Sequence, residues 1–584
     1  MSSRFFLVLI LSLLSFSNAR AFTPAPAPEH TEQIPTSPDY RSVNGYYYGL
    51  QFSPEWGGGL FLGLDISNRI INLTPTALSP GHVPELSLDD FRNGLRFTRT
   101  RGFDAALGPN GFLESAEDWG KWTPFVGLMP VYGRRSTSSQ YVSDHQQMSD
   151  LPKLKVPGAP TDLEQWNLND WLVYETTGGV MFHGGSGSTV LAAAELRFMA
   201  AGEWSVAIEK TGIRTVYVRI GKKNIQSFTQ IIGALTVVID NNLFQNKDES
   251  FSYSFDLDDP EALVAYHYML GGNLLPAEEL SVRATGAVRA VASTKSKGAG
   301  RLTTLRFGFP FFSYTGKTKG RIQISQLRAE HADGSESSVE SGIHLNERAT
   351  GGVLLIQRRT VNDFIATSAV TKNKEQVVTQ NTYSGEFVWA YENEKASYKR
   401  VRKQLDKIVA QTGLRDELAV IIPNVPLGYF QTSLRVLIDE KTTNELIEAS
   451  RDRLSDDGGV RSLSSSFVQQ YFADGDDKDR LCGRIHRIRG SLARCARKLE
   501  KDTGAALKEA AVWLQKMENA KRASNRRAFV AAYAAAGKFL FANQFTVKAT
   551  LALLRNRPPA IQFAVAGERV SLLKKTIEQK ITIP

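Results

Sequence analysis

Cysteine is nearly absent from this chain. Only Cys482 and Cys495 occur among its 584 residues. On one continuous helix these two residues would lie roughly 20 Å apart at about 1.5 Å per residue, and that separation is too large for a disulfide. We therefore favour thiols that are free or bonded to another molecule over a local bridge, which would require a helix break near Gly490.

Long apolar runs are also missing, apart from one at the N-terminus. Phe5–Phe16 is too short to span a hydrocarbon core of about 30 Å. Arg4 precedes this run and the small-x-small pattern Ala19–Ala21 follows it, which is typical of a cleaved signal peptide over residues 1–21. A proline-rich spacer covers residues 22–43. We expect an exported protein that is periplasmic, outer-membrane-associated or secreted, and the scarcity of cysteine favours a bacterial envelope.

The sequence lacks the common catalytic and metal-binding motifs. It contains no Gly-x-Ser-x-Gly elbow, no His-Glu-x-x-His pair and no phosphate-binding loop. Residues 180–185 resemble the strand and oxyanion loop of some lipases and esterases, but Ser188 stands where the elbow needs its last glycine, so we expect a flexible turn there. The acidic cluster Asp474–Asp479 departs from the EF-hand pattern. We therefore expect no catalytic, cofactor or metal residues, although the enzyme question stays open.

Net positive charge is confined to the last fifth of the chain. From Arg480 to the end, 22 Lys and Arg face 6 Asp and Glu, so residues 1–479 are net acidic although the whole chain carries +10. Apolar residues at helical spacing over Asp477–Ala520 predict a long helix with a basic opposite side. That side carries Arg484, Arg487, Arg494, Arg497, Lys498, Lys501 and Lys508. We expect these cations to bind an anionic surface.

Alternating apolar residues dominate residues 44–392. Tyr383–Tyr391 shows the clearest alternation, and Ile231–Asp240 is a continuous apolar run that predicts a strand buried on both faces. Residues 68–175 have weak periodicity, which predicts long loops or irregular strands. One helix is expected after Asp258, because Asp, Pro and Glu begin it and glycines end it. This β-rich region forms one domain, or two with a break near residues 258–280.

Helical spacing dominates the α-rich basic region, residues 393–584. Two long helices, Asp477–Ala520 and Asn525–Leu554, are expected to pack as an antiparallel hairpin. The fold class is α+β, with a large antiparallel β region (sandwich or partial barrel) followed by this hairpin. The remaining expected elements are a helix from Tyr398, a strand over Leu418–Ile422, a helix over Thr442–Leu454, a loop over Ser455–Gly475 and closing strands over Ile561–Val565 and Val570–Ile583.

The pattern supports three functional hypotheses. The first is a non-catalytic envelope protein that binds an anionic lipid, an envelope polymer or a protein partner through the basic helices. The second is an exported hydrolase or toxin with a site built from loops of the β region. The third is an outer-membrane-integrated protein, although the helical C-terminal quarter and the final Pro584 argue against a complete transmembrane barrel. Nucleic acid is disfavoured, because aromatic residues are not interleaved with the cations.

Overall fold

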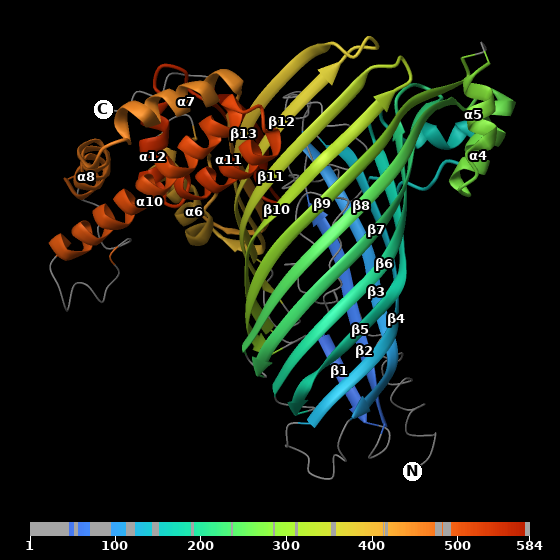
Figure 1. Ribbon diagram of the computed structural model, residues 1–584, viewed down its shortest axis with the longest axis horizontal. Helices are drawn as coiled ribbons and strands as arrows, with labels where there is room; N and C mark the ends of the chain where they lie inside the picture. The colour runs from blue at the N-terminus through green and yellow to red at the C-terminus, as the bar shows by residue number, and fades with distance from the viewer. Residues whose placement is uncertain are drawn as a thin grey trace.

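The protein combines one large antiparallel sheet with an α-helical C-terminal region (Figure 1). The computed structural model describes residues 46–51, 56–69, 95–112, 123–142, 151–188, 192–234, 237–283, 286–309, 313–351, 358–412, 414, 418–473, 482 and 492–577. The α+β class predicted from the sequence is confirmed. The β region is one sheet and not two stacked sheets.

Sixteen strands follow one another in sequence order, and each is antiparallel to the next. They are β1 (Tyr46–Gln51), β2 (Trp56–Arg69), β3 (Leu95–Phe112), β4 (Thr123–Val142), β5 (Trp171–Ser188), β6 (Ala192–Lys210), β7 (Thr215–Ala234), β8 (Val237–Asp256), β9 (Val288–Phe309), β10 (Ser313–His331), β11 (Glu336–Gly351), β12 (Arg358–Lys372), β13 (Val378–Ser397), β14 (Pro426–Ile438), β15 (Ala560–Gly567) and β16 (Val570–Ile577).

The helices are insertions between these strands. They are the 3-10 helix η3 (Pro160–Gln165), α4 (Pro260–Leu270), α5 (Leu275–Ser281), α6 (Tyr398–Thr412), α7 (Glu440–Arg453), α8 (Asp457–Ala473), α10 (Leu492–Arg522), α11 (Arg526–Leu540) and α12 (Gln544–Leu553). The sheet continues across residue 393, because β14, β15 and β16 join β13 in order.

The sheet is rolled, so that strands far apart in its order meet (Figure 1). One cluster of buried residues joins Phe97 of β3 and Val142 of β4 with Val361 of β12, Ala390 of β13 and Ala564 of β15. The rolled sheet therefore has an inner face and an outer face, and successive residues of each strand alternate between them.

The first helical layer covers the upper outer face of β5–β9. Asp259 caps α4 by accepting a hydrogen bond from the Ala262 backbone nitrogen at 2.9 Å, and Pro260 stands in the first turn, as the sequence predicts. Tyr266 of α4 is fully buried, with its ring edge against Phe255 of β8. The layer thus buries apolar side chains on the outer side of the sheet.

The second helical layer covers the outer face of β11–β15. Phe364 of β12 and Phe387 of β13 stack on Phe541, which directly follows α11. Arg526, at the first position of α11, donates hydrogen bonds from its guanidinium to Ser338 and Ser368 at 2.7–2.9 Å. Aromatic stacking and a four-bond polar anchor therefore hold α11 against β11–β13.

The described helices correct several predictions for the C-terminal region. The expected helix Asp477–Ala520 is described from Leu492 onward as α10, and Cys482 and Cys495 form a disulfide with Cα atoms 5.9 Å apart, so the expectation that they do not bond is wrong. The expected loop Ser455–Gly475 is mostly α8, and the expected strand Leu418–Ile422 is not a strand.

The second expected helix, Asn525–Leu554, is divided into α11 and α12. Asn543 is the N-cap of α12, because its side chain accepts hydrogen bonds from the backbone nitrogens of Phe545 and Thr546. A new helix therefore begins at this point. The expected packing of α10 against the next helix is seen for α11, since buried residues of both helices belong to the same core.

Candidate functional site

The inner face of the sheet combines apolar clusters, such as Met129, Met181 and Met199 behind β4–β6, with buried ion pairs. Lys223 on β7 contacts Glu203 on β6 at 3.2 Å. Three further pairs lie on this face: Arg219 with Asp248 at 3.2 Å, Arg359 with Glu347 at 3.0 Å and Arg435 with Glu386 at 3.5 Å. Buried charges are costly unless they are paired, and these are paired across neighbouring strands.

The outer face of β3–β8 is largely apolar and exposed below α4 and α5, with outward amides such as Gln230 and Asn241 between the apolar residues of β7 and β8. Large apolar side chains are exposed there at Phe103, Leu107, Val126, Leu128, Tyr132, Val180, Phe182, Leu196, Phe198, Phe228, Ile232, Ile239 and Leu243, a set that we call the apolar band. Leu128 retains 55% of its accessible surface and Phe198 retains 46%. Isolated exposed apolar residues are ordinary, but a contiguous set on six neighbouring strands marks an interaction surface.

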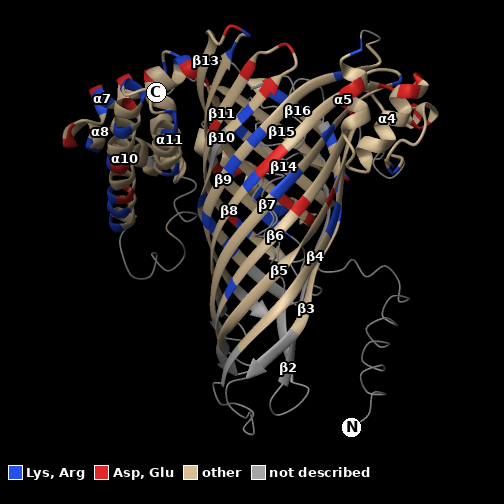
Figure 2. Ribbon diagram, turned by 45° about the vertical axis from the view of Figure 1, so that its right-hand side comes forward, with Lys and Arg blue, Asp and Glu red and all other residues tan. Residues whose placement is uncertain are grey.

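Charges bound the apolar band on its upper side. Outward-facing Arg101, Arg134, Lys222 and Lys247 follow the band on β3, β4, β7 and β8, whereas the described outward positions within the band carry no Asp, Glu, Lys or Arg. Figure 2 shows the same division, since the lower part of the described sheet is largely tan and charged residues crowd the upper part. The outer face therefore changes from apolar to charged along the strands.

Two strands of this surface lie in a segment whose structure the sequence left open. Residues 68–175 were expected to form long loops or irregular strands, and β3 and β4 are strands of 18 and 20 residues. The signal was present in the outward set Val126, Leu128 and Tyr132, which alternates with Gly127, Met129 and Val131. Both sets are apolar at this end of β4, so the alternation of polarity that identifies a half-buried strand is weak.

The prediction that Ile231–Asp240 forms one strand buried on both faces is also wrong. It is divided between the end of β7 and the start of β8, which pair at Ile232 and Ile239. Ile232 and Ile239 are 49% and 41% exposed, so they lie on the open outer face. In the sequence, the adjacent apolar ends of two paired strands were therefore interpreted as one buried strand.

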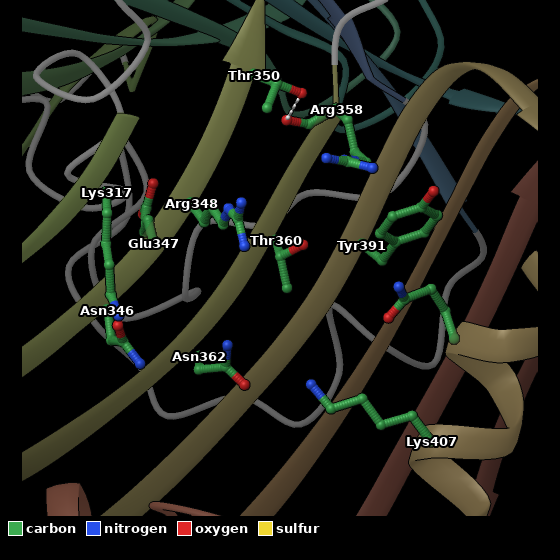
Figure 3. Close-up of a pocket in the computed structure, with 11 residues that line it drawn as sticks. Lys317, Asn346, Glu347, Arg348, Thr350, Arg358, Thr360, Asn362, Tyr391 and Lys407 are labelled. Carbon is green, nitrogen blue, oxygen red and sulfur yellow. Dashed lines mark hydrogen bonds between the residues drawn. The ribbon is translucent and has the colours of Figure 1, made fainter. Parts of the chain in front are cut away.

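A second feature of the outer face is a groove over β10–β13, beside α6. It encloses about 420 Å³ and is lined by Lys317, Asn346, Glu347, Arg348, Thr350, Arg358, Thr360, Asn362, Tyr391, Gln404 and Lys407 (Figure 3). Four of these residues are cationic, and the single carboxylate, Glu347, is bound at 3.0 Å by Arg359. We call this feature the cationic groove. None of its residues was predicted from the sequence to form a binding site.

The basic residues predicted from the sequence lie elsewhere. Arg494, Arg497, Lys498, Lys501 and Lys508 are exposed on α10. Lys508 is paired with Asp457 of α8 at 2.7 Å, which holds the pKa of Asp457 below its usual value. Arg484 and Arg487 fall outside the described residues, as does the acidic cluster Asp474–Asp479. The cations of α10 therefore lie on the helical layer and not in the cationic groove.

The region that resembles an oxyanion loop is part of a strand. His183 lies on the inner face of β5 and is fully buried, and the predicted flexible turn is therefore wrong. Within the described residues, no three His, Cys, Asp or Glu side chains are placed together as metal ligands.

Among the described carboxylates outside the strands, Asp170 has the most strongly shifted pKa. It lies between η3 and β5, where its Oδ2 accepts a hydrogen bond from the Asn167 backbone nitrogen at 2.9 Å. Burial raises its pKa to about 6, against the opposing effect of Arg96 and Lys210 nearby. Lys210 in turn donates to the carbonyl oxygens of Leu163 and Trp166. This polar cluster anchors η3 to the sheet.

No protein-family model matches the chain, and neither a curated protein nor a solved structure matches it. None of the described helices is both long enough and apolar enough to cross a membrane.

Proposed function

We propose that the chain is an envelope protein that inserts the apolar band of β3–β8 into the hydrocarbon region of a membrane. The observation that carries the proposal is the set of large apolar side chains exposed on the outer face of β3–β8, while the buried charges on the inner face of the same sheet are paired. Strands that contact lipid have this pattern, because their outer residues meet hydrocarbon and their inner residues do not.

The energetics favour lipid over water as the environment of the band. Removing a half-exposed Leu or Phe from water contributes about 1 kcal/mol, so the thirteen side chains together contribute roughly 10 kcal/mol. The described residues of the band carry no charge that would oppose this transfer. Along β4 the band runs from Val126 to Tyr132, or about 20 Å of strand at about 3.3 Å per residue.

The residues at the upper edge of the band fit the headgroup region of a membrane. Tyr132 ends the band on β4, and outward-facing Arg134 follows it. Aromatic rings and long cationic side chains are favoured at this level, because their apolar parts lie in hydrocarbon and their polar ends reach water. The proposal therefore also accounts for the order of residues along the strand.

The test places an environment-sensitive fluorophore at single introduced cysteines of the full chain. Leu128→Cys and Phe198→Cys report on the band, and Val512→Cys on α10 is the control, because Val512 is also exposed, at 48%. With vesicles of neutral lipid, we expect blue-shifted emission and quenching by brominated acyl chains at positions 128 and 198 only. Emission typical of water at both band positions in vesicle-bound protein would overturn the proposal.

The exposed cations of α10 support a second candidate, a peripheral contact with an anionic surface. Arg494, Lys498 and Lys501 face solvent on one helix. In that case vesicle binding would require anionic lipid and would fall steeply with salt, because exposed charges are screened. Quenching at position 512 without quenching at positions 128 and 198 would favour this candidate.

A further inference from the structure

The cationic groove is built from adjacent rows of side chains on the outer face. Lys317 of β10 lies directly opposite Arg348 of β11, Arg348 lies opposite Thr360 of β12, and Thr360 lies opposite Tyr391 of β13. The next row places Thr350 opposite Arg358, whose backbone carbonyl accepts a hydrogen bond from the Thr350 hydroxyl at 3.5 Å. Figure 3 shows that Arg348 and Arg358 reach toward the same space.

The pairing of Lys317 with Arg348 is unfavourable in the absence of a ligand. Like charges directly opposite on neighbouring strands destabilise a sheet, because their Cβ atoms are about 4.5–5.5 Å apart. Glu347 faces the inner side and is bound by Arg359, so it does not neutralise this pair. A bound anion would offset the repulsion.

Helix α6 closes one side of the groove. Lys407 of α6 extends toward the strands (Figure 3), and Gln404 lines the same space. Asn346 and Asn362 add amide groups, and Thr360 adds a hydroxyl. Two guanidinium forks with several neutral donors suit an anion with several oxygens, and Arg in particular matches phosphate geometry.

The groove continues sideways from the apolar band. Ile232, Ile239, Leu305 and Lys317 lie opposite one another on β7, β8, β9 and β10. The outer face therefore changes from apolar to cationic within about two strand spacings, or roughly 10 Å. A molecule with an anionic end and an apolar end would meet both surfaces at once.

We propose that the cationic groove binds a phosphate monoester, either as the headgroup of a lipid or as a soluble phosphorylated molecule. The volume of about 420 Å³ falls within the range of small-molecule sites, about 300–1,000 Å³. The binding site does not depend on insertion of the apolar band, because every group that contacts the phosphate belongs to β10–β13 or α6.

The experiment compares two pairs of charge-removing substitutions in the full chain. Lys317→Gln with Arg348→Gln removes two cations from the groove. Lys153→Gln with Lys155→Gln removes two exposed cations from the segment before η3 and leaves both the groove and the edge of the apolar band intact. Binding is measured with vesicles of neutral lipid, of neutral lipid with phosphatidic acid and of neutral lipid with oleate, and by calorimetry with inorganic phosphate and short-chain phosphatidic acid.

We expect the chain to bind vesicles with phosphatidic acid more tightly than vesicles with oleate. The variant with both groove substitutions should lose about tenfold of this gain in affinity, and the control variant should lose less than twofold. Tighter binding of short-chain phosphatidic acid than of inorganic phosphate by the unsubstituted chain assigns the lipid as source. Equal affinities for the two, both lost in the groove pair, assign a soluble source. Equal losses in both variant pairs, or equal binding to oleate and phosphatidic acid, would overturn the proposal. The calorimetric arms remain decisive if the band does not insert.

Discussion

The outer faces of β3–β8 and of β11–β15 both carry large apolar side chains, but below α4 and α5 the described helices cover only the second. Phe364, Phe387 and Trp389 lie beneath α6–α12 and are fully buried or nearly so, whereas Leu128 and Phe198 keep about half of their surface exposed. The difference shows that the chain provides its own cover for one half of the sheet and leaves the other half open. We infer that lipid covers the open half.

The largest effect is expected from placing charge in the open half. Leu128→Arg with Phe198→Arg should weaken insertion into neutral vesicles, since an Arg in hydrocarbon costs about 2–4 kcal/mol on a lipid-facing strand. Vesicle flotation of the folded protein measures the effect. Val512→Arg is the matched control on exposed α10, and a similar loss in this control would contradict the comparison.

A smaller effect is expected from overpacking the contact between α11 and the sheet in the covered half. Gly537 of α11 faces the ring of Phe364 so closely that an added Cβ would collide with it. Gly537→Ala should therefore lower the free energy of unfolding by about 1–3 kcal/mol, as overpacking does. Gly504→Ala on α10 is the control, because a Cβ there would make ordinary contact with Ser464 at 3.5 Å. Denaturant titration followed by circular dichroism distinguishes the two, and equal stability of both variants would contradict this account.

A comparable but more local effect is expected at the polar anchor of α11. Arg526→Gln removes charged hydrogen bonds to Ser338 and Ser368 and should cost about 1–3 kcal/mol. Arg527→Gln removes the same charge from an exposed neighbour and should change stability little. Hydrogen exchange of α11 amides measures the local loss. Unchanged protection in the Arg526 variant would show that aromatic stacking alone holds the helix.

The comparison also explains which features the sequence could predict. Asp259 with Pro260 and Tyr383–Tyr391 have short-range signals, since a cap and an alternation depend on neighbouring residues. The division of Asn525–Leu554 depended on one capping residue, Asn543, inside an apolar stretch. The cationic groove could not be predicted, because Lys317, Arg348, Arg358 and Lys407 meet only through strand register and helix docking.

The same physical reason applies to the disulfide and to the apolar band. Helical spacing alone placed Cys482 and Cys495 on one continuous helix, whereas their disulfide brings the two Cα atoms within 5.9 Å of each other. To predict the apolar band from the sequence, one would have to know which face of the sheet α4 and the C-terminal helices cover. Periodicity identifies an apolar face, whereas only the packed structure identifies what covers it.

The smallest effect concerns the polar cluster that anchors η3 above the open half. Because burial raises the pKa of Asp170 to about 6 in the folded protein, the folded state binds a proton that the unfolded state releases near pH 4. The contribution of Asp170 to stability is therefore greatest below its unfolded pKa and falls as the pH rises toward 6. Relative to Asp170→Asn, the wild-type chain should lose about 2 kcal/mol between pH 4 and pH 6.5 and then remain constant. Urea titrations of both proteins across this range measure the difference, and a difference independent of pH would show that Asp170 is already ionised at pH 4.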